Sequence, residues 1–166
     1  MAVDMYLYFE GGTQKAEGET QDDTYSKKKA CDVLAWSWGI SQSGTFHSGG
    51  GGGAGKANFQ DLSVTKWVDT MSPILQYACA VGDHFDKAYL VVRKAGTAQN
   101  EYMEYTFTKV LITSVSTGGS GGEDRLTENV SLNFAEVEYK YTPQDEKGKK
   151  GKPIEFKYDI AKMKTK

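Results

Sequence analysis

The chain has 166 residues, a net charge of −2 and ordinary hydrophobic (39%) and charged (25%) fractions, which suits one globular domain spanning residues 1–166. No stretch reaches the ~20 apolar residues that span a membrane. Two cysteines, Cys31 and Cys79, are too few for a disulfide framework, and the two histidines, His47 and His84, lack zinc-site spacing. We therefore expect no metal and no cofactor.

The charge is unevenly distributed along the chain. Residues 143–166 contain eight lysines and four acids, so this segment carries +4 and the remainder −6. We interpret it as a partly mobile, solvated basic segment with a last strand near 154–160. The alternative is a lysine-tailed nucleic-acid-binding module, although the tail lacks arginine. The first residues, Met1–Met5, show no basic segment followed by an apolar run, so we expect no signal peptide.

The first half of the chain alternates with a period of two, which is typical of strands. Met5, Leu7 and Phe9 predict a first strand, and the polar residues 11–29 predict a connection. Residues 31–44 read "CDVLAWSWGISQSG" and predict a strand with one bulky and one smooth face. The bulky face, expected in the core, is Leu34, Trp36, Trp38 and Ile40. The smooth face is Val33, Ala35, Ser37, Gly39 and Ser41.

The second half contains one helix among further strands. Strands are expected within 59–68, 88–93, 102–115, 130–141 and 154–160. The apolar parity switches inside 130–141, which predicts a bulge in that strand. In 72–81, Ser72 can cap a helix, Pro73 suits its first turn and Gly82 suits its end. The pattern predicts a mainly β fold, a barrel or sandwich with one short appended helix.

The glycine run at 49–55 resembles part of a phosphate-binding loop, because Gly50, Gly55 and Lys56 have the spacing G-x-x-x-x-G-K. Ala57 stands where such a loop needs Ser or Thr, and the following residues are β-branched and aromatic rather than helical. We interpret the run as a long loop that becomes ordered against another surface. Its candidate residues for contact with a neighbouring subunit or ring are Ser43, Gly44, His47, Gly50, Gly53, Gly55 and Lys56.

Catalytic patterns are weak throughout the chain. Ser26–Lys29 and Ser63–Lys66 match S-x-x-K without any supporting motif, and no G-x-S-x-G occurs. Paired acids such as Asp22-Asp23 fall in polar loops, where solvated charge explains them. We expect no enzyme, with an uncharacterised small enzyme as an alternative.

Three stretches together resemble one known family. They are "DVLAWSWGISQSG" at 32–44, "DTMSPILQYACAVG" at 69–82 and "TSVSTGGSGGEDRLTENVSLNFAEV" at 113–137. In this order they resemble the tube protein of bacterial type VI secretion systems, the hemolysin-coregulated protein family. The resemblance covers 2–160 and implies a two-sheet antiparallel β-barrel with one helix, six copies of which form a ring. It also implies rings that stack into a tube inside a contractile sheath, with a spike at the tip.

The resemblance further implies that the protein is made in the bacterial cytoplasm and expelled through the secretion system, and that small effector proteins can travel in the ring lumen. It implies no nucleic-acid partner and no membrane insertion. If Leu34, Trp36, Trp38 and Ile40 fill the barrel, then Ala35, Ser37, Gly39 and Ser41 face outward. We hypothesise that these small residues line the lumen. An ordinary solvent-facing or subunit-facing strand is the alternative.

Overall fold

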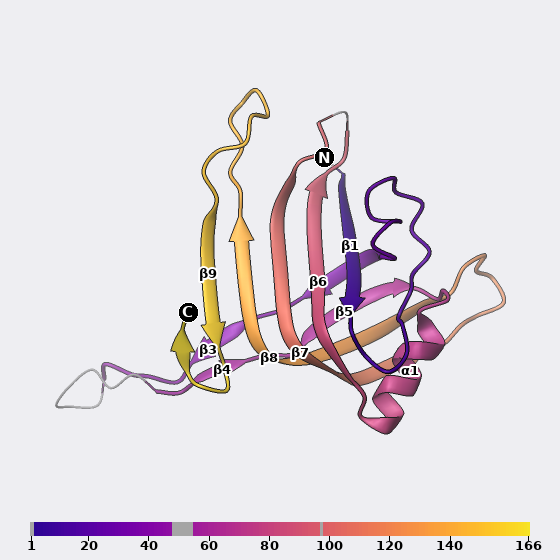
Figure 1. Ribbon diagram of the computed structural model, residues 1–166, viewed down its shortest axis with the longest axis horizontal. Coiled ribbons are helices and arrows are strands. Elements are labelled where there is room, and N and C mark those ends of the chain that lie inside the picture. The colour runs from indigo at the N-terminus through magenta and orange to yellow at the C-terminus, as the bar shows by residue number, and fades with distance from the viewer. Residues whose placement is uncertain (1, 48–54, 97) are drawn as a thin grey trace.

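Figure 1 shows a computed structural model that describes residues 2–47, 55–96 and 98–166. The elements are β1 (Val3–Glu10), β2 (Cys31–Ser37), β3 (Ile40–Gln42), β4 (Ala57–Phe59), β5 (Leu62–Trp67), α1 (Ser72–Val81), β6 (His84–Lys94), β7 (Glu101–Thr117), β8 (Thr127–Tyr141), β9 (Ile154–Asp159) and β10 (Lys164–Thr165). Six antiparallel strands pair in the order β8-β5-β2-β1-β6-β7, and β7 pairs with β8 to close a barrel. The prediction of a mainly β barrel with one helix is confirmed.

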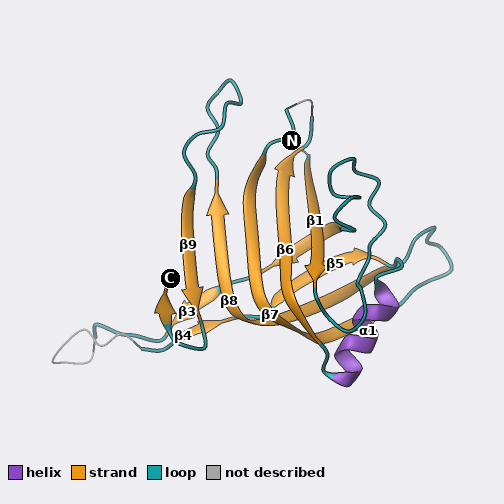
Figure 2. Cartoon of the chain, in the orientation of Figure 1, coloured by secondary structure: helices purple, strands orange, loops and turns teal. Residues whose placement is uncertain are grey.

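The remaining strands extend the barrel on one side. β9 pairs with the end of β8, β10 pairs with β9, and β3 and β4 form a separate hairpin. In Figure 2 several strands stand upright and others lie across beneath them, with α1 at the end of the molecule opposite β9 and β10. The strand expected near 154–160 is therefore present as β9.

The inward face of β7 and β8 changes partway along both strands. Phe107 and Val137 are paired and buried, and both have odd numbers. Val110 and Phe134 are also paired and buried, but both have even numbers, so the inward face has changed from odd to even residues. Lys109, with φ of 56°, lies between them on β7. β7 and β8 both bend along their length from the upright layer into the lower one (Figure 1). The parity switch in 130–141 is real, but the predicted one-strand bulge is wrong.

A bulge does occur in β2, and it changes which side chains fill the barrel. The register shifts between Val33 and Ala35, so Val33 is buried while Leu34 is 38% exposed. Ile40 is 45% exposed because it starts the separate β3–β4 hairpin. The core assignment of Leu34 and Ile40 is therefore corrected. Trp36 and Trp38 pack against the buried core, as their pattern suggested.

The helix occupies the predicted residues, Ser72–Val81, but begins differently from the expectation. Gly82 ends it in the left-handed conformation, φ 71°, and its N–H bonds to the carbonyl of Ala78. No side chain caps its start, where Met71 is the N-cap, because the Ser72 hydroxyl is used in a buried cluster. Among the residues described, no helix is long and apolar enough to cross a membrane.

The connection at 11–30 packs on the outer face of β1 and β6. The Tyr25 ring stacks on Tyr6 with a centroid distance of 4.4 Å, and the Tyr25 hydroxyl donates to Glu101 at 3.1 Å. Arg93 on β6 forms an ion pair with Asp22 of the connection. The segment expected to be a polar connection thus contributes Tyr25 to a second apolar cluster.

Candidate functional site

The lower layer of the barrel carries a row of four serines on its outer face. Ser37 of β2 pairs with Ser63 of β5, Ser63 pairs with Ser131 of β8, and Ser131 pairs with Ser114 of β7. Residues directly opposite on neighbouring strands point to the same face, so the four hydroxymethyl groups form one line across the sheet. The row contains no residue larger than serine.

A second row runs beside the first on the same four strands. It consists of Ala35, Thr65, Asn129 and Ser116, paired in that order. The Thr65 hydroxyl donates to Asn129 Oδ1 at 2.7 Å, which fixes both side chains against the sheet. We call the two rows together the small-polar face. None of its eight residues is charged or aromatic.

The small-polar face forms because successive side chains of each strand point to opposite faces of the sheet. On β5 the residues between its members, Leu62, Val64 and Lys66, are buried, and on β8 Val130 and Leu132 are buried. At the margin, Asp61 accepts from Thr113 at 2.8 Å and from Asn133 at 2.8 Å, so both of its carboxylate oxygens have partners. The face therefore presents hydroxyl and amide groups but no charged side chain.

The structure brings together two of the four residues expected to line the lumen. Val33, the fifth residue of the expected smooth face, is buried. Ala35 and Ser37 lie in the small-polar face and are exposed. Gly39 lies in the link to the hairpin, where its carbonyl accepts from Gln60 N at 3.0 Å. Ser41 lies on β3 opposite Asn58. The pattern along one strand could not reveal the six partner residues, since they depend on register.

The loop residues expected to make contacts extend from the β3–β4 hairpin. Ser43, Gly44 and His47 are exposed, whereas Gly50 and Gly53 lie outside the described residues. A side chain at Gly55 would collide with the Ser43 hydroxyl, so glycine permits the close approach of the two arms. Sequence reasoning missed Phe46, which is 93% exposed on this loop.

Lys56 does not sit in a phosphate-binding geometry. The chain continues from Lys56 into strand β4, Ala57–Phe59, so the helix N-terminus that such a loop requires is not there. Across the described residues, no group of three His, Cys, Asp or Glu side chains could hold a metal ion.

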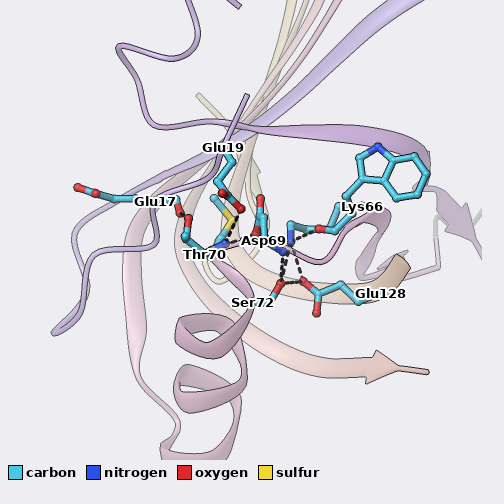
Figure 3. Close-up of polar contacts among 9 residues, drawn as sticks. Glu17, Glu19, Lys66, Asp69, Thr70, Ser72 and Glu128 are labelled. Carbon is cyan, nitrogen blue, oxygen red and sulfur yellow. Dashed lines mark hydrogen bonds and ion pairs between the residues drawn. The ribbon is translucent and has the colours of Figure 1, made fainter. Parts of the chain in front are cut away.

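A buried ionic cluster lies beside the start of α1 (Figure 3). Lys66 Nζ donates to Glu128 Oε1 at 2.6 Å and to Asp69 Oδ1 at 2.8 Å. The Ser72 hydroxyl donates to the same Glu128 oxygen at 2.6 Å and accepts from Asp69 N at 2.9 Å. The cluster ties the start of α1 to β5 and β8. The signal that could have found it was the inward parity of Lys66 with Leu62 and Val64.

Ionisation in the interior follows from this arrangement. Burial alone would lower the pKa of Lys66, but hydrogen bonds to Asp69 and Glu128 outweigh it and raise the pKa above its ordinary value. Burial raises the pKa of the nearby Cys31 thiol to about 12, so this cysteine stays protonated and is a poor nucleophile.

Comparison with known proteins decides the family. A family model described as "Type VI secretion system effector, Hcp" matches residues 6–141, which is most of the chain. The chain belongs to the Hcp family. It is 53% identical to protein hcp1 of Pseudomonas aeruginosa over 162 residues, which covers 96% of both proteins. This Hcp chain is thus a tube protein of the type VI secretion system, as the resemblance implied.

Solved Hcp structures share the fold. A type six secretion system protein superposes with a TM-score of 0.90 at 33% identity, covering 99% of this chain and 100% of the other. Hcp1 from Salmonella typhimurium superposes with a TM-score of 0.80 at 35% identity over the full length of both chains. A type VI secretion system effector from Yersinia pestis superposes with a TM-score of 0.74 at 30% identity, covering 94% of this Hcp chain and 99% of the effector chain.

Proposed function

We propose that six copies of this Hcp chain close into a ring and that the rings stack into the inner tube of the secretion machine. The tube lies inside a contractile sheath, carries a spike at its tip and is expelled from the cytoplasm into a target cell. Membership of the Hcp family supports this role. The single observation that carries the lumen assignment is the small-polar face, which includes Ala35 and Ser37.

The chemistry of the small-polar face suits the wall of a passage. Its hydroxyl and amide groups stay hydrated, so a cargo protein that slides past loses little hydrogen bonding and meets no fixed charge. Large apolar patches would hold cargo by burying area, at about 25 cal/mol per Å². A wall of serine, threonine and asparagine therefore allows small effectors to be carried and released.

The proposal includes no catalytic step and no cofactor. The serines of the small-polar face lie beside other serines, and Ser72 donates to a carboxylate already paired with Lys66, so neither arrangement places a histidine base on a serine nucleophile. The buried thiol of Cys31 is held protonated by burial, which raises its pKa. These features support a structural subunit over a small enzyme.

The lysine-rich segment also supports a structural role over nucleic-acid binding. Lys157 forms ion pairs with Glu138 at 3.1 Å and with Glu155 at 3.4 Å. Lys166 pairs with Glu136, and Lys150 pairs with Glu101 at 3.4 Å. Lysines that face carboxylates on the same sheet present little free positive charge to a phosphate backbone.

Sedimentation velocity on the purified chain, with negative-stain images of the same sample, tests the proposal. We expect one species with the mass of six copies and ring-shaped particles with a central hole. A chain that sediments as a monomer across the accessible concentration range would contradict it.

A further inference from the structure

The small-polar face ends at an aromatic side chain. The alternation of β5 continues past Ser63 and Thr65 to Trp67, so the Trp67 ring lies on the same outer face as those two residues. Trp67 is half-buried and pairs directly with Thr127 of β8. The Arg125 guanidinium lies over the Trp67 ring, 4.5 Å from the ring centroid. We call Trp67 and Arg125 the anchor pair, which stands at the margin of a face without charged residues.

The backbone beside Arg125 is fixed to the sheet. Val68 N donates to the Leu126 carbonyl at 2.9 Å, which extends the pairing of β5 and β8 one step beyond Trp67. The Leu126 side chain packs against Gly119, where an added Cβ would lie 2.7 Å from Leu126 Cδ2. Stacking on Trp67 also restricts the Arg125 side chain, so a ligand would have to order less of it on binding. The anchor pair is therefore preorganised.

The Arg125 guanidinium keeps its hydrogen-bonding capacity free. Arg125 is exposed, and among the residues that the structure describes no carboxylate forms an ion pair with it. The other arginine of the chain, Arg93, is by contrast buried and paired with Asp22. An arginine that stacks on an aromatic ring still presents the edge of its planar N–H fork, and the geometry of that fork matches a carboxylate. Arg125 can therefore accept a carboxylate that this chain does not supply.

A polar hollow of about 380 Å³ lies next to the anchor pair. Its lining includes Ser116 and Asn129 of the small-polar face, and Thr127, which is directly opposite Trp67. The hydroxyl and amide groups of these residues can bond to the peptide groups of a polypeptide segment. Glu123 also lines the hollow, so its charge disfavours an extended polyanion. The site suits a polypeptide that brings a single carboxylate to the guanidinium.

We propose that the anchor pair selects the cargo of the ring by binding an aspartate or glutamate side chain of the cargo protein. The inference rests on the lumen assigned under the proposed function and adds the chemistry that recognises cargo there. The small-polar face has no charged side chain, so by itself it distinguishes poorly between cargo surfaces. Six copies would place six guanidinium groups around one passage, and several weak contacts to one cargo protein reinforce one another.

A short acidic peptide tests the site directly. The probe is a fluorescently labelled peptide of alternating alanine and glutamate, its control is the alanine–glutamine peptide, and fluorescence anisotropy measures the binding of both to the purified ring. We expect the acidic peptide to bind more tightly, and less so as salt is added. Arg125→Gln should weaken its binding by about tenfold, as for the loss of one charge-assisted hydrogen bond. Arg125→Lys keeps the charge without the planar fork and should retain only part of the binding.

Glu123→Gln is the matched control, because it removes a charge of opposite sign two residues away and should bind the acidic peptide at least as tightly as the unchanged ring. Equal binding of the acidic peptide to the Arg125→Gln ring and the unchanged ring would overturn the anchor pair, as would equal binding of the two peptides to the unchanged ring. Effectors that co-purify with the ring separate this inference from the proposed function. Their loss in Ser37→Gln but not in Arg125→Gln would overturn the anchor pair alone, whereas their retention in both variants would also refute the lumen assignment.

Discussion

Lys66 Nζ lies 2.6 Å from Glu128 Oε1, and both side chains are buried. The two residues are directly paired on the neighbouring barrel strands β5 and β8. The second Glu128 oxygen, Oε2, is also buried and has no hydrogen-bond partner among the residues described. The pair is therefore held by one short contact, supported by Asp69 and Ser72, at the point where α1 begins.

Removing one partner of this pair should be more harmful than removing both. Lys66→Met leaves Glu128 and Asp69 buried without their cation, which costs about 3–5 kcal/mol in comparable cases. We expect Lys66→Met to lower the free energy of unfolding by that amount in urea titrations at fixed protein concentration. The double variant Lys66→Met/Glu128→Gln should recover part of the loss. Equal stability of the single and double variants would show that charge burial is not the cause.

The attachment of the connection at 11–30 should depend on pH through Asp22. Burial alone would raise the pKa of Asp22, but hydrogen bonds from Tyr25 N, Arg93 and Thr24 N outweigh it and lower the pKa below its ordinary value. A lowered folded-state pKa gives stability that is complete above the ordinary aspartate pKa. That stability is lost as the pH falls through the folded-state value. Acid should therefore release the connection from β1 and β6.

Hydrogen exchange can measure this release at the Ala30 amide, which bonds to the Tyr25 carbonyl at 3.1 Å. Protection should fall as the pH drops below the ordinary aspartate range, beyond the intrinsic pH effect on exchange. Asp22→Asn should show reduced protection already at neutral pH and little further change in acid. An identical pH profile in both proteins would exclude Asp22 as the anchor.

Ser37→Gln should change cargo without changing the ring. The longer side chain would stand above the serine row and narrow the passage, while the strand pairing of Ser37 with Ser63 is kept. We expect normal rings in sedimentation velocity and at least a severalfold loss of small effectors that co-purify with them. Lys140→Gln introduces the same side chain outside the small-polar face, where Lys140 pairs with Glu104, and should retain cargo. Full cargo retention by Ser37→Gln would count against the lumen assignment.

Shortening the loop at 43–56 tests whether it contacts another copy. Gln42 and Ala57 are directly paired at the ends of β3 and β4, so a two-residue Asn-Gly turn can join them. We expect rings to shift toward monomers, or stacking of rings to stop, because Phe46 and its neighbours are lost. Phe46→Ser in the full-length loop should give a weaker effect in the same direction. Unchanged sedimentation and unchanged micrographs for both proteins would contradict the contact.

Much of the fold could be predicted because local rules determine it. Pro73 and Gly82 defined both ends of α1, and the alternation of Ile154, Phe156 and Tyr158 identified β9. The exposure of Leu34 could not be predicted, since an extra residue in β2 is visible only once β5 is paired with it. The exchange of faces beside Lys109 was equally hidden, because the pairing register of β7 and β8 is the same on both sides of it.

The candidate site was predictable only in its first strand. Ala35 and Ser37 are readable from alternation, but Ser63, Ser131 and Ser114 belong to the same face through pairings between residues far apart in the sequence. The same limit applies to Lys66, whose inward parity was visible while its partner Glu128 lies 62 residues away.

The circular pairing of the six barrel strands has a mechanical consequence. Each of the six barrel strands pairs with a neighbour on both of its sides, so a force on one strand is shared by two others, although β1 and β2 pair only at Tyr6–Asp32 and Leu7–Cys31. β9 lies outside the circle, where β10 covers it over only two residue pairs, and it is the strand expected to detach first under load. A subunit under load would thus keep its six-stranded barrel intact while β9 and β10 detach from it.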